Sequence, residues 1–319
     1  MSFYTGVGTN LQFGKEGAFG TPATATAMVN LTSESIVESY EKGDEGSLLA
    51  SKTATDKDLL GVNVGGSVSF VLRPEFAGLL FHGAMGGADA VTEATGGFYN
   101  HTIHLCDVNE DLPSLTFKMD RKATKAVYAG CTISTLQLDC VAGDYVKGSF
   151  DIVGTYESPS GTMEELGAYT IPSYRCIGAT CSYDGLTFDV SSATIKIDNG
   201  LVDAPKTFSS GLYKGKPQHG KRTVTLDFEI PYNIDLDNQV VIWKTKGNIP
   251  FSITLKATDG RDEYTLNINI PHVTLDSYSH SVGGTGLVTA SGSGEALSKG
   301  SDEPITVVIK DKHSESYSG

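Results

Sequence analysis

The sequence predicts a mainly β protein that contains the same β-rich unit twice. Hydrophobic and polar residues alternate over most of the chain, for example at Leu115, Phe117 and Met119 and again over residues 264–270. Alternation of period two is typical of half-buried strands. Helical patterns are few. Each unit is therefore expected to consist of a strand, a short helix and three further strands.

Matching segments at a common spacing indicate the duplication. Val68–Arg73 has the same hydrophobic pattern as Val224–Glu229, which begins 156 residues later. Two further pairs share a spacing of 138 residues: Leu115–Lys118 with Ile253–Lys256, and Gly148–Gly154 with Gly286–Gly292. Shared spacing is harder to produce by chance than one similar strand. The difference of 18 residues is expected as an insertion in the first copy between Pro74 and Leu112.

The length of the chain agrees with two modules. A chain of 319 residues exceeds a usual single core, whereas two units of about 150 residues fit the ordinary size of a domain. The turn-forming stretch Glu157–Thr162 and the pair Pro172–Ser173 favour a boundary between them. We place the two modules at residues 1–165 and 166–319.

Two segments have helical patterns. Pro74–Met85 begins with proline and carries apolar residues at nearly helical spacing, and Asp237–Thr245, with Trp243, is the equivalent segment in the second copy. Trp243 is expected in the core or in a subunit interface.

Two long polar segments predict arms. Tyr40–Gly61 contains two leucine pairs, and Asn199–Lys221 is its counterpart in the second copy. Apolar residues in such segments suggest ordering against a neighbouring subunit, although a surface loop that folds back on its own module is the alternative. The residues expected to contact the neighbour are Leu48, Leu49, Leu59, Leu60, Phe208, Leu212 and Tyr213.

Composition and charge limit the function. The formal net charge is −14, with 38 acidic and 24 basic residues, so tight binding of nucleic acid through phosphate contacts is not expected. No apolar run approaches the length of about 18 residues that a membrane-spanning helix needs. No secretory signal is visible at the amino terminus, so we expect assembly in a cytoplasm and no membrane partner. The five scattered cysteines are expected to be free thiols.

The sequence predicts no catalytic residue, metal site or cofactor, and hence no enzyme. Phosphate-loop, zinc-protease and serine-hydrolase motifs do not occur. The nearest metal-like cluster is His101–Cys106, where His104 and Cys106 would share a strand face and His101 would point to the other. Cys176 and Cys181 are spaced poorly for a chelate or a redox pair.

Several of these segments resemble the tail tube proteins of long-tailed bacteriophages, in the longer type with two tandem tube modules. The resemblance spans roughly residues 10–295 and is carried by Leu11–Thr24, Leu31–Ser35, Gly65–Phe70 and Ile195–Leu201. It implies that each module is a β-sandwich or half-barrel with a flanking helix. It also implies a structural virion protein whose inner sheets join into rings of six modules, so that a chain with two modules would close as a trimer with pseudo-sixfold symmetry.

The same resemblance implies the partners and the location. The rings would stack into the hollow tube of the tail, through which DNA passes without lasting contacts, and an acidic bore would favour such passage. Further partners would be the tape measure, the tail tip or baseplate, and the terminator. The protein would be assembled in the cytoplasm of the host bacterium and would reside in the virion.

Two other classes of function stay open at the level of sequence. A secreted or surface β-sandwich that binds or adheres would need an export signal or an exposed aromatic platform. A β-rich hydrolase would need His101 or His104 to meet a carboxylate in a pocket.

Overall fold

The fold is mainly β, as predicted: strands make up 58% and helix 4%. The computed structural model describes residues 5–44, 57–159, 161–183, 186–232, 249–281 and 288–318. The expected second helix at Asp237–Thr245, with Trp243, lies outside these residues. The strands, in chain order, are β1 (Asn10–Lys15), β2 (Ala27–Val29), β3 (Leu31–Glu34), β4 (Val37–Gly43), β5 (Asp58–Val71), β6 (Gly86–Ala94), β7 (Phe98–Leu105), β8 (Leu115–Asp120), β9 (Lys125–Val141), β10 (Lys147–Gly154), β11 (Tyr156–Ser158), β12 (Arg175–Tyr183), β13 (Leu186–Phe188), β14 (Ser192–Asp198), β15 (Thr223–Pro231), β16 (Ile249–Asp259), β17 (Asp262–Ser281), β18 (Thr289–Ala296) and β19 (Thr306–Asp311).

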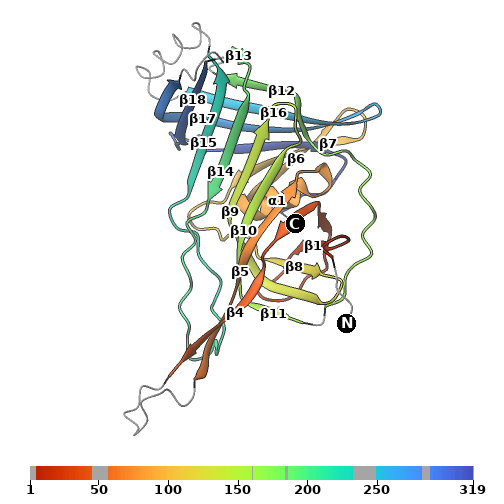
Figure 1. The fold of residues 1–319 in the computed structure, drawn as a ribbon, viewed down its shortest axis with the longest axis vertical. Coiled ribbons are helices and arrows are strands. Elements are labelled where there is room, and N and C mark those ends of the chain that lie inside the picture. The colour runs from red at the N-terminus through yellow and green to blue at the C-terminus, as the bar shows by residue number, and fades with distance from the viewer. Residues whose placement is uncertain are drawn as a thin grey trace.

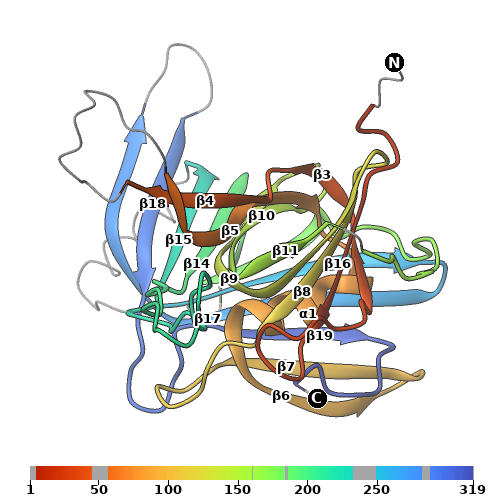
Figure 2. The same cartoon turned by 90° about the horizontal axis from the view of Figure 1, so that it is seen from below.

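The predicted first helix is confirmed at α1 (Pro74–Met85), the one α-helix within the described residues. Pro74 stands in its first turn, where a missing N–H removes no helical hydrogen bond. Gly86 ends it in the left-handed conformation (φ 77°) and donates its N–H to the His82 carbonyl. The helix is buried on nearly all sides. Figure 2 shows α1 enclosed between β6, β7 and β19 on one side and the region of β5 and β10 on the other.

Strands of the two halves pair in the same order. In the first half β2 pairs with β1, β1 with β8, β8 with β9, β9 with β10, and β10 with β5. In the second half β13 pairs with β12, β12 with β16, β16 with β17, β17 with β18, and β18 with β15. The hairpin of β6 and β7 lies in the expected insertion after α1. The division into modules at residue 165 stays a prediction.

One sequence match is displaced by the strand register. Gly148 is the ladder partner of Leu138 and Phe70, and Gly294 has the same place between Leu275 and Leu226. A side chain would not fit at either glycine, because an added Cβ would lie 2.5 Å from the carbonyl oxygen of Gln137 or Thr274, respectively. By its place in the ladder Gly294 is thus the match to Gly148, whereas Gly286 lies outside the described residues. Sliding a strand by an even number of residues preserves its alternation, so the pattern alone could not fix the register.

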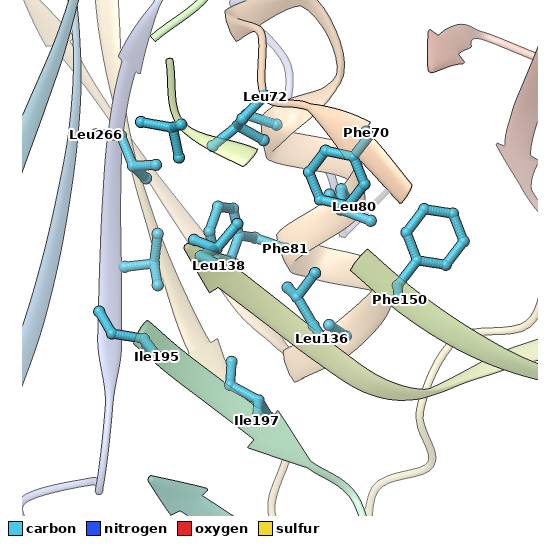
Figure 3. Close-up of a cluster of buried hydrophobic side chains, with 14 of the residues drawn as sticks. Phe70, Leu72, Leu80, Phe81, Leu136, Leu138, Phe150, Ile195, Ile197 and Leu266 are labelled. Atoms are coloured by element: carbon cyan, nitrogen blue, oxygen red, sulfur yellow. The ribbon is translucent and has the colours of Figure 1, made fainter. Parts of the chain in front are cut away.

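Eight strands form the main ladder of the molecule, in the order β3, β5, β10, β9, β14, β15, β18 and β17. The pairing of β9 with β14 joins the two halves. Alternate side chains of this ladder point toward α1 and form a continuous apolar core. Figure 3 shows part of it, with Leu136 and Leu138 from β9, Ile195 and Ile197 from β14, and Phe81 from α1.

Candidate assembly surfaces

The opposite face of the main ladder is polar. Most side chains that alternate with the core residues of β9, β10, β14, β15 and β18 are serines, threonines and charged residues, and they are half-buried or exposed. The exceptions are Gln137, Val141, Val153 and Pro231. One row of cross-strand partners runs through all eight strands as Ser33, Ser69, Ser149, Gln137, Lys196, Thr225, Glu295 and Thr274. We call this surface the polar face.

The polar face is acidic. It carries two lysines, Lys147 and Lys196, against six carboxylates, which are Asp139, Asp151, Asp198, Asp227, Glu229 and Glu295. Asp139 is held in place because it accepts hydrogen bonds from Gln137 Nε2 and Thr194 Oγ1, both at 2.9 Å. Asp151 likewise accepts a hydrogen bond from Thr135 Oγ1 at 2.6 Å. The negative potential is therefore fixed on ordered strands, which suits a surface that repels polyanions.

The two predicted arms lie side by side within one chain. The hairpin of β4 and β5 extends beyond the body, and the segment 199–221 runs along it (Figure 1). Val62 of β5 donates its N–H to the Leu212 carbonyl at 3.0 Å, and the Tyr213 ring packs edge-on against Tyr156 with centroids 5.8 Å apart. Lys206 forms an ion pair with Glu41 and donates to the Leu60 carbonyl.

The residues predicted to contact a neighbour have different environments. Phe208 is fully exposed, Leu60 is 56% exposed, and Leu59 and Tyr213 are about 40% exposed. Leu212 is half-buried and its backbone is bonded to β5. Leu48 and Leu49 lie outside the described residues. The arm therefore exposes apolar side chains while its base is bonded to its own chain, and the contact of these residues with a neighbouring subunit stays a prediction.

The histidines of the metal-like cluster serve other contacts. His101 is fully buried, with Nδ1 2.9 Å from Asp89 Oδ2 and Nε2 3.3 Å from Asp311 Oδ1. His104 is 3.1 Å from Glu303, and Cys106 Sγ accepts a hydrogen bond from Arg222. Within the described residues, no three His, Cys, Asp or Glu side chains are grouped to hold a metal ion.

The buried His101 is a cation between two carboxylates. Burial by itself would lower the pKa of His101, but hydrogen bonds to Asp311 and Asp89 outweigh burial and raise it to about 10. Burial likewise opposes ionisation of Asp89, yet His101 and the Tyr317 N–H hold its pKa below the ordinary value. The rings of His313 and Tyr317 cover the group. This cluster fastens the C-terminal segment to β6 and β7.

Three thiols meet across the two halves, an arrangement that sequence analysis missed. Cys140 of β9 and Cys176 and Cys181 of β12 line one cavity of about 490 Å³. A hydrogen bond between the thiols of Cys140 and Cys176, with burial, raises the pKa of Cys140, and the same bond lowers the pKa of Cys176. The described cysteines are free, as expected.

Comparison with known proteins gives the family. The model of a family described as phage tail tube protein matches residues 6–296, whereas no curated protein matches the sequence. The match extends over nearly the whole chain and includes every strand of the main ladder and both arms. No helix among the described residues is long and apolar enough to span a membrane. Because the family model matches nearly the whole chain, the chain belongs to the phage tail tube protein family.

Proposed function

We propose that three copies of this chain close into a ring with pseudo-sixfold symmetry, and that stacked rings form the tail tube through which the phage DNA passes. Family membership gives a structural protein of the virion tail and implies a non-enzymatic role. The observation that carries the finer proposal is the main ladder, which has an apolar core on one face and an acidic polar face on the other. A polar face directed to the lumen would meet DNA without attracting its phosphates.

The repeated pairing order supports the threefold stoichiometry. Each half of the chain contributes four strands to the main ladder, which agrees with one equivalent wall segment from each half in the proposed ring. Three copies would give about 24 strands, and at ~4.8 Å between strands the circumference is ~115 Å before strand tilt widens it. Closure also removes the sheet edges that would otherwise invite uncontrolled aggregation.

The arms would connect successive rings. They extend away from the body (Figure 1) and expose Leu60, Phe208 and Tyr213, which are side chains of the kind that anchor protein interfaces. A head-to-tail contact of this kind propagates without closing and produces a filament. The tape measure in the lumen, with the tip or baseplate at one end and the terminator at the other, completes the proposed set of partners.

Electron microscopy of the purified protein tests this function. We expect rings or uniform hollow filaments with threefold or pseudo-sixfold end-on views, and a mass by light scattering that is a multiple of three chains. A protein that stays monomeric over a wide range of concentrations, also with the other tail components added, would contradict the proposal.

Substituting the exposed arm residue Phe208 by serine is expected to shorten or abolish tubes while leaving the fold unchanged. Its side chain is fully exposed, and surface substitutions change stability by no more than about 0.5 kcal/mol. The lengths of filaments in electron micrographs and the thermal unfolding curve give the two readouts. Val7→Ser is the matched control, because Val7 is 85% exposed but lies before β1, outside both arms. Tubes of normal length from Phe208→Ser would show that Phe208 takes no part in the proposed contact between rings.

A further inference from the structure

The thiols of Cys140 and Cys176 lie together beside the joint of the two halves. Cys140 is near the end of β9, where its ladder partner on β14 is Ala193. Cys176 is on β12, 36 positions later in the sequence. Both side chains line the same cavity, and a hydrogen bond joins the two thiols. A covalent bond between them would therefore tie β12 to the strand at which the halves meet.

Backbone contacts hold Cys176 over the turn that follows β9. Cys176 donates its N–H to the Asp144 carbonyl at 2.9 Å, and its neighbour Arg175 forms a β-bridge with Tyr145. The N–H of Val141, the residue after Cys140, donates to the Cys176 sulfur. The position of this sulfur against the end of β9 is thus set by the fold of the main chain.

An irregularity in β12 allows the Cys176 thiol to shift. The ladder with β16 is interrupted between Arg175 and Thr180, so the residues between them, Cys176 among them, bulge from the strand. Gly178 in this bulge has the left-handed conformation, with φ 71°. Two hydrogen-bonded sulfurs have to approach to about 2.05 Å to form a disulfide. A bulge supplies such movement without breaking the ladder on either side of it.

The two sulfurs have different chemistry. Hydrogen bonds from the Cys140 thiol and the Val141 N–H outweigh burial and lower the pKa of Cys176, which is half-buried. The bond between the thiols, together with burial, raises the pKa of Cys140, which is 4% exposed. Because the thiolate is the form that attacks a disulfide, Cys176 is suited to attack first and Cys140 to follow.

The third thiol of the cavity is less suited to such a bond. Cys181 is fixed in the ladder between Phe188 on β13 and Ile253 on β16. It is buried, and burial raises its pKa to about 12. Cys181 is therefore protonated at neutral pH and is held on the regular part of β12.

We propose that Cys140 and Cys176 are a site of oxidative modification, at which a low-molecular-weight disulfide converts the two thiols into a bond that locks the joint between the halves. Cys176 Sγ attacks one sulfur of the small disulfide, so that a mixed disulfide forms and one small thiolate leaves. Cys140 Sγ then attacks Cys176 Sγ and displaces the second small thiolate. The two protein thiols are oxidised, their protons pass to the leaving thiolates, and the small disulfide is reduced to two thiols.

The surroundings of the protein decide when the bond forms. A reducing cytoplasm keeps thiols free, so the pair would stay reduced during the proposed assembly in the host. Outside the cell that reducing system is absent, and the tail of a released virion would carry the bonded form. The timing rests on the proposed function, whereas the site itself rests on contacts within one chain.

Oxidised glutathione tests the site in the purified full-length protein. After treatment, the remaining thiols are blocked with N-ethylmaleimide and counted by intact mass, and peptide mapping identifies the bonded residues. We expect two fewer blocked thiols, a link between Cys140 and Cys176, and no retained glutathione. The midpoint of thermal unfolding should rise by about 5 °C, because the bond constrains the unfolded chain. Reduction with dithiothreitol should reverse this rise.

Cys140→Ala and Cys181→Ala are the matched variants. Cys140→Ala removes the second attacking thiol, so Cys176 should retain one glutathione and the midpoint should not rise. Cys181→Ala removes a thiol of the same cavity but should form the bond as the parent protein does. Thermal unfolding of the reduced variants establishes that each is folded. The peptide map of the parent protein decides the pairing even where a variant fails to fold.

The outcomes separate the site, its timing and the ring. A folded parent protein that keeps all its thiols free, or that joins Cys176 to Cys181, overturns the site. Protein blocked with N-ethylmaleimide at the moment of bacterial lysis should carry free thiols, and a bond already present at that point overturns the timing. A protein that forms the bond but neither rings nor tubes overturns the proposed function and leaves the site in place.

Discussion

Replacing His101 by leucine is expected to lower the free energy of unfolding by about 3–5 kcal/mol, the usual cost of removing one partner from a buried ion pair. The imidazole lies between Asp89 and Asp311, whose side chains are 0% and 6% exposed. Leucine fills a similar volume but leaves both carboxylates without their cation. Urea unfolding followed by fluorescence measures the loss. His104→Leu is the control, since that half-exposed pair with Glu303 is expected to contribute no more than about 1 kcal/mol.

The pH dependence of stability gives a second readout for His101. Because its pKa is raised from 6.5 to about 10 in the folded protein, its contribution is complete below pH 6.5 and is lost as the pH rises through 10. The lowered pKa of Asp89 works in the opposite direction, so its contribution is present above the ordinary value of 3.8 and is lost in acid. His101→Leu should therefore lack the alkaline decrease between about pH 6.5 and 10. Equal alkaline slopes for both proteins would show that His101 is not the titrating group.

Replacing Asn199 by alanine is expected to destabilise the protein by about 2–4 kcal/mol, because buried partners would be left unsatisfied. Asn199 is fully buried. Its Nδ2 donates to the carbonyls of Ala84 at 2.9 Å and Ile133 at 3.0 Å, and its Oδ1 accepts from Arg222 Nε at 2.8 Å. One side chain thus ties the end of α1 to β9 and to the segment before β15.

The control for Asn199 is Asn63→Ala. Asn63 also donates a side-chain hydrogen bond, to Glu41 at 2.8 Å, but on an exposed surface. The expected loss there is about 0.5 kcal/mol or less. A loss for Asn199→Ala as small as that of the control, measured by urea unfolding, would mean that water replaces the amide at this position.

Local pattern was sufficient for the elements that local chemistry decides. The helix at Pro74–Met85 was predicted with both ends correct, because proline at its start and Gly86 after its end act on their immediate neighbours. The alternation on β15, with Val224, Leu226 and Phe228 buried, likewise follows from the period of a strand.

Contacts between distant segments could not be predicted in this way. The pair of His101 and Asp311 is separated by 210 positions, and the proximity of Cys140 to Cys176 depends on how β12 packs beside β9. Leucines in a polar segment indicated burial somewhere, yet only the fold shows that Leu212 is bonded to β5 of its own chain while Phe208 stays exposed. The sequence predicted an acidic bore without naming its residues, and the acidic polar face that we propose for it is defined by a strand order that the sequence does not reveal.

The pairing of β9 with β14 places two wall segments on one continuous polypeptide. In the proposed ring, half of the seams are thus made during folding and only three require an encounter between molecules. Closing the ring then removes the translational and rotational freedom of two additional bodies, where six separate single-segment chains would lose that of five, and each such loss opposes association by several kcal/mol, roughly 4–15. Each remaining seam can therefore be weaker at the same subunit concentration, which allows incorrectly joined subunits to dissociate before the circle is complete.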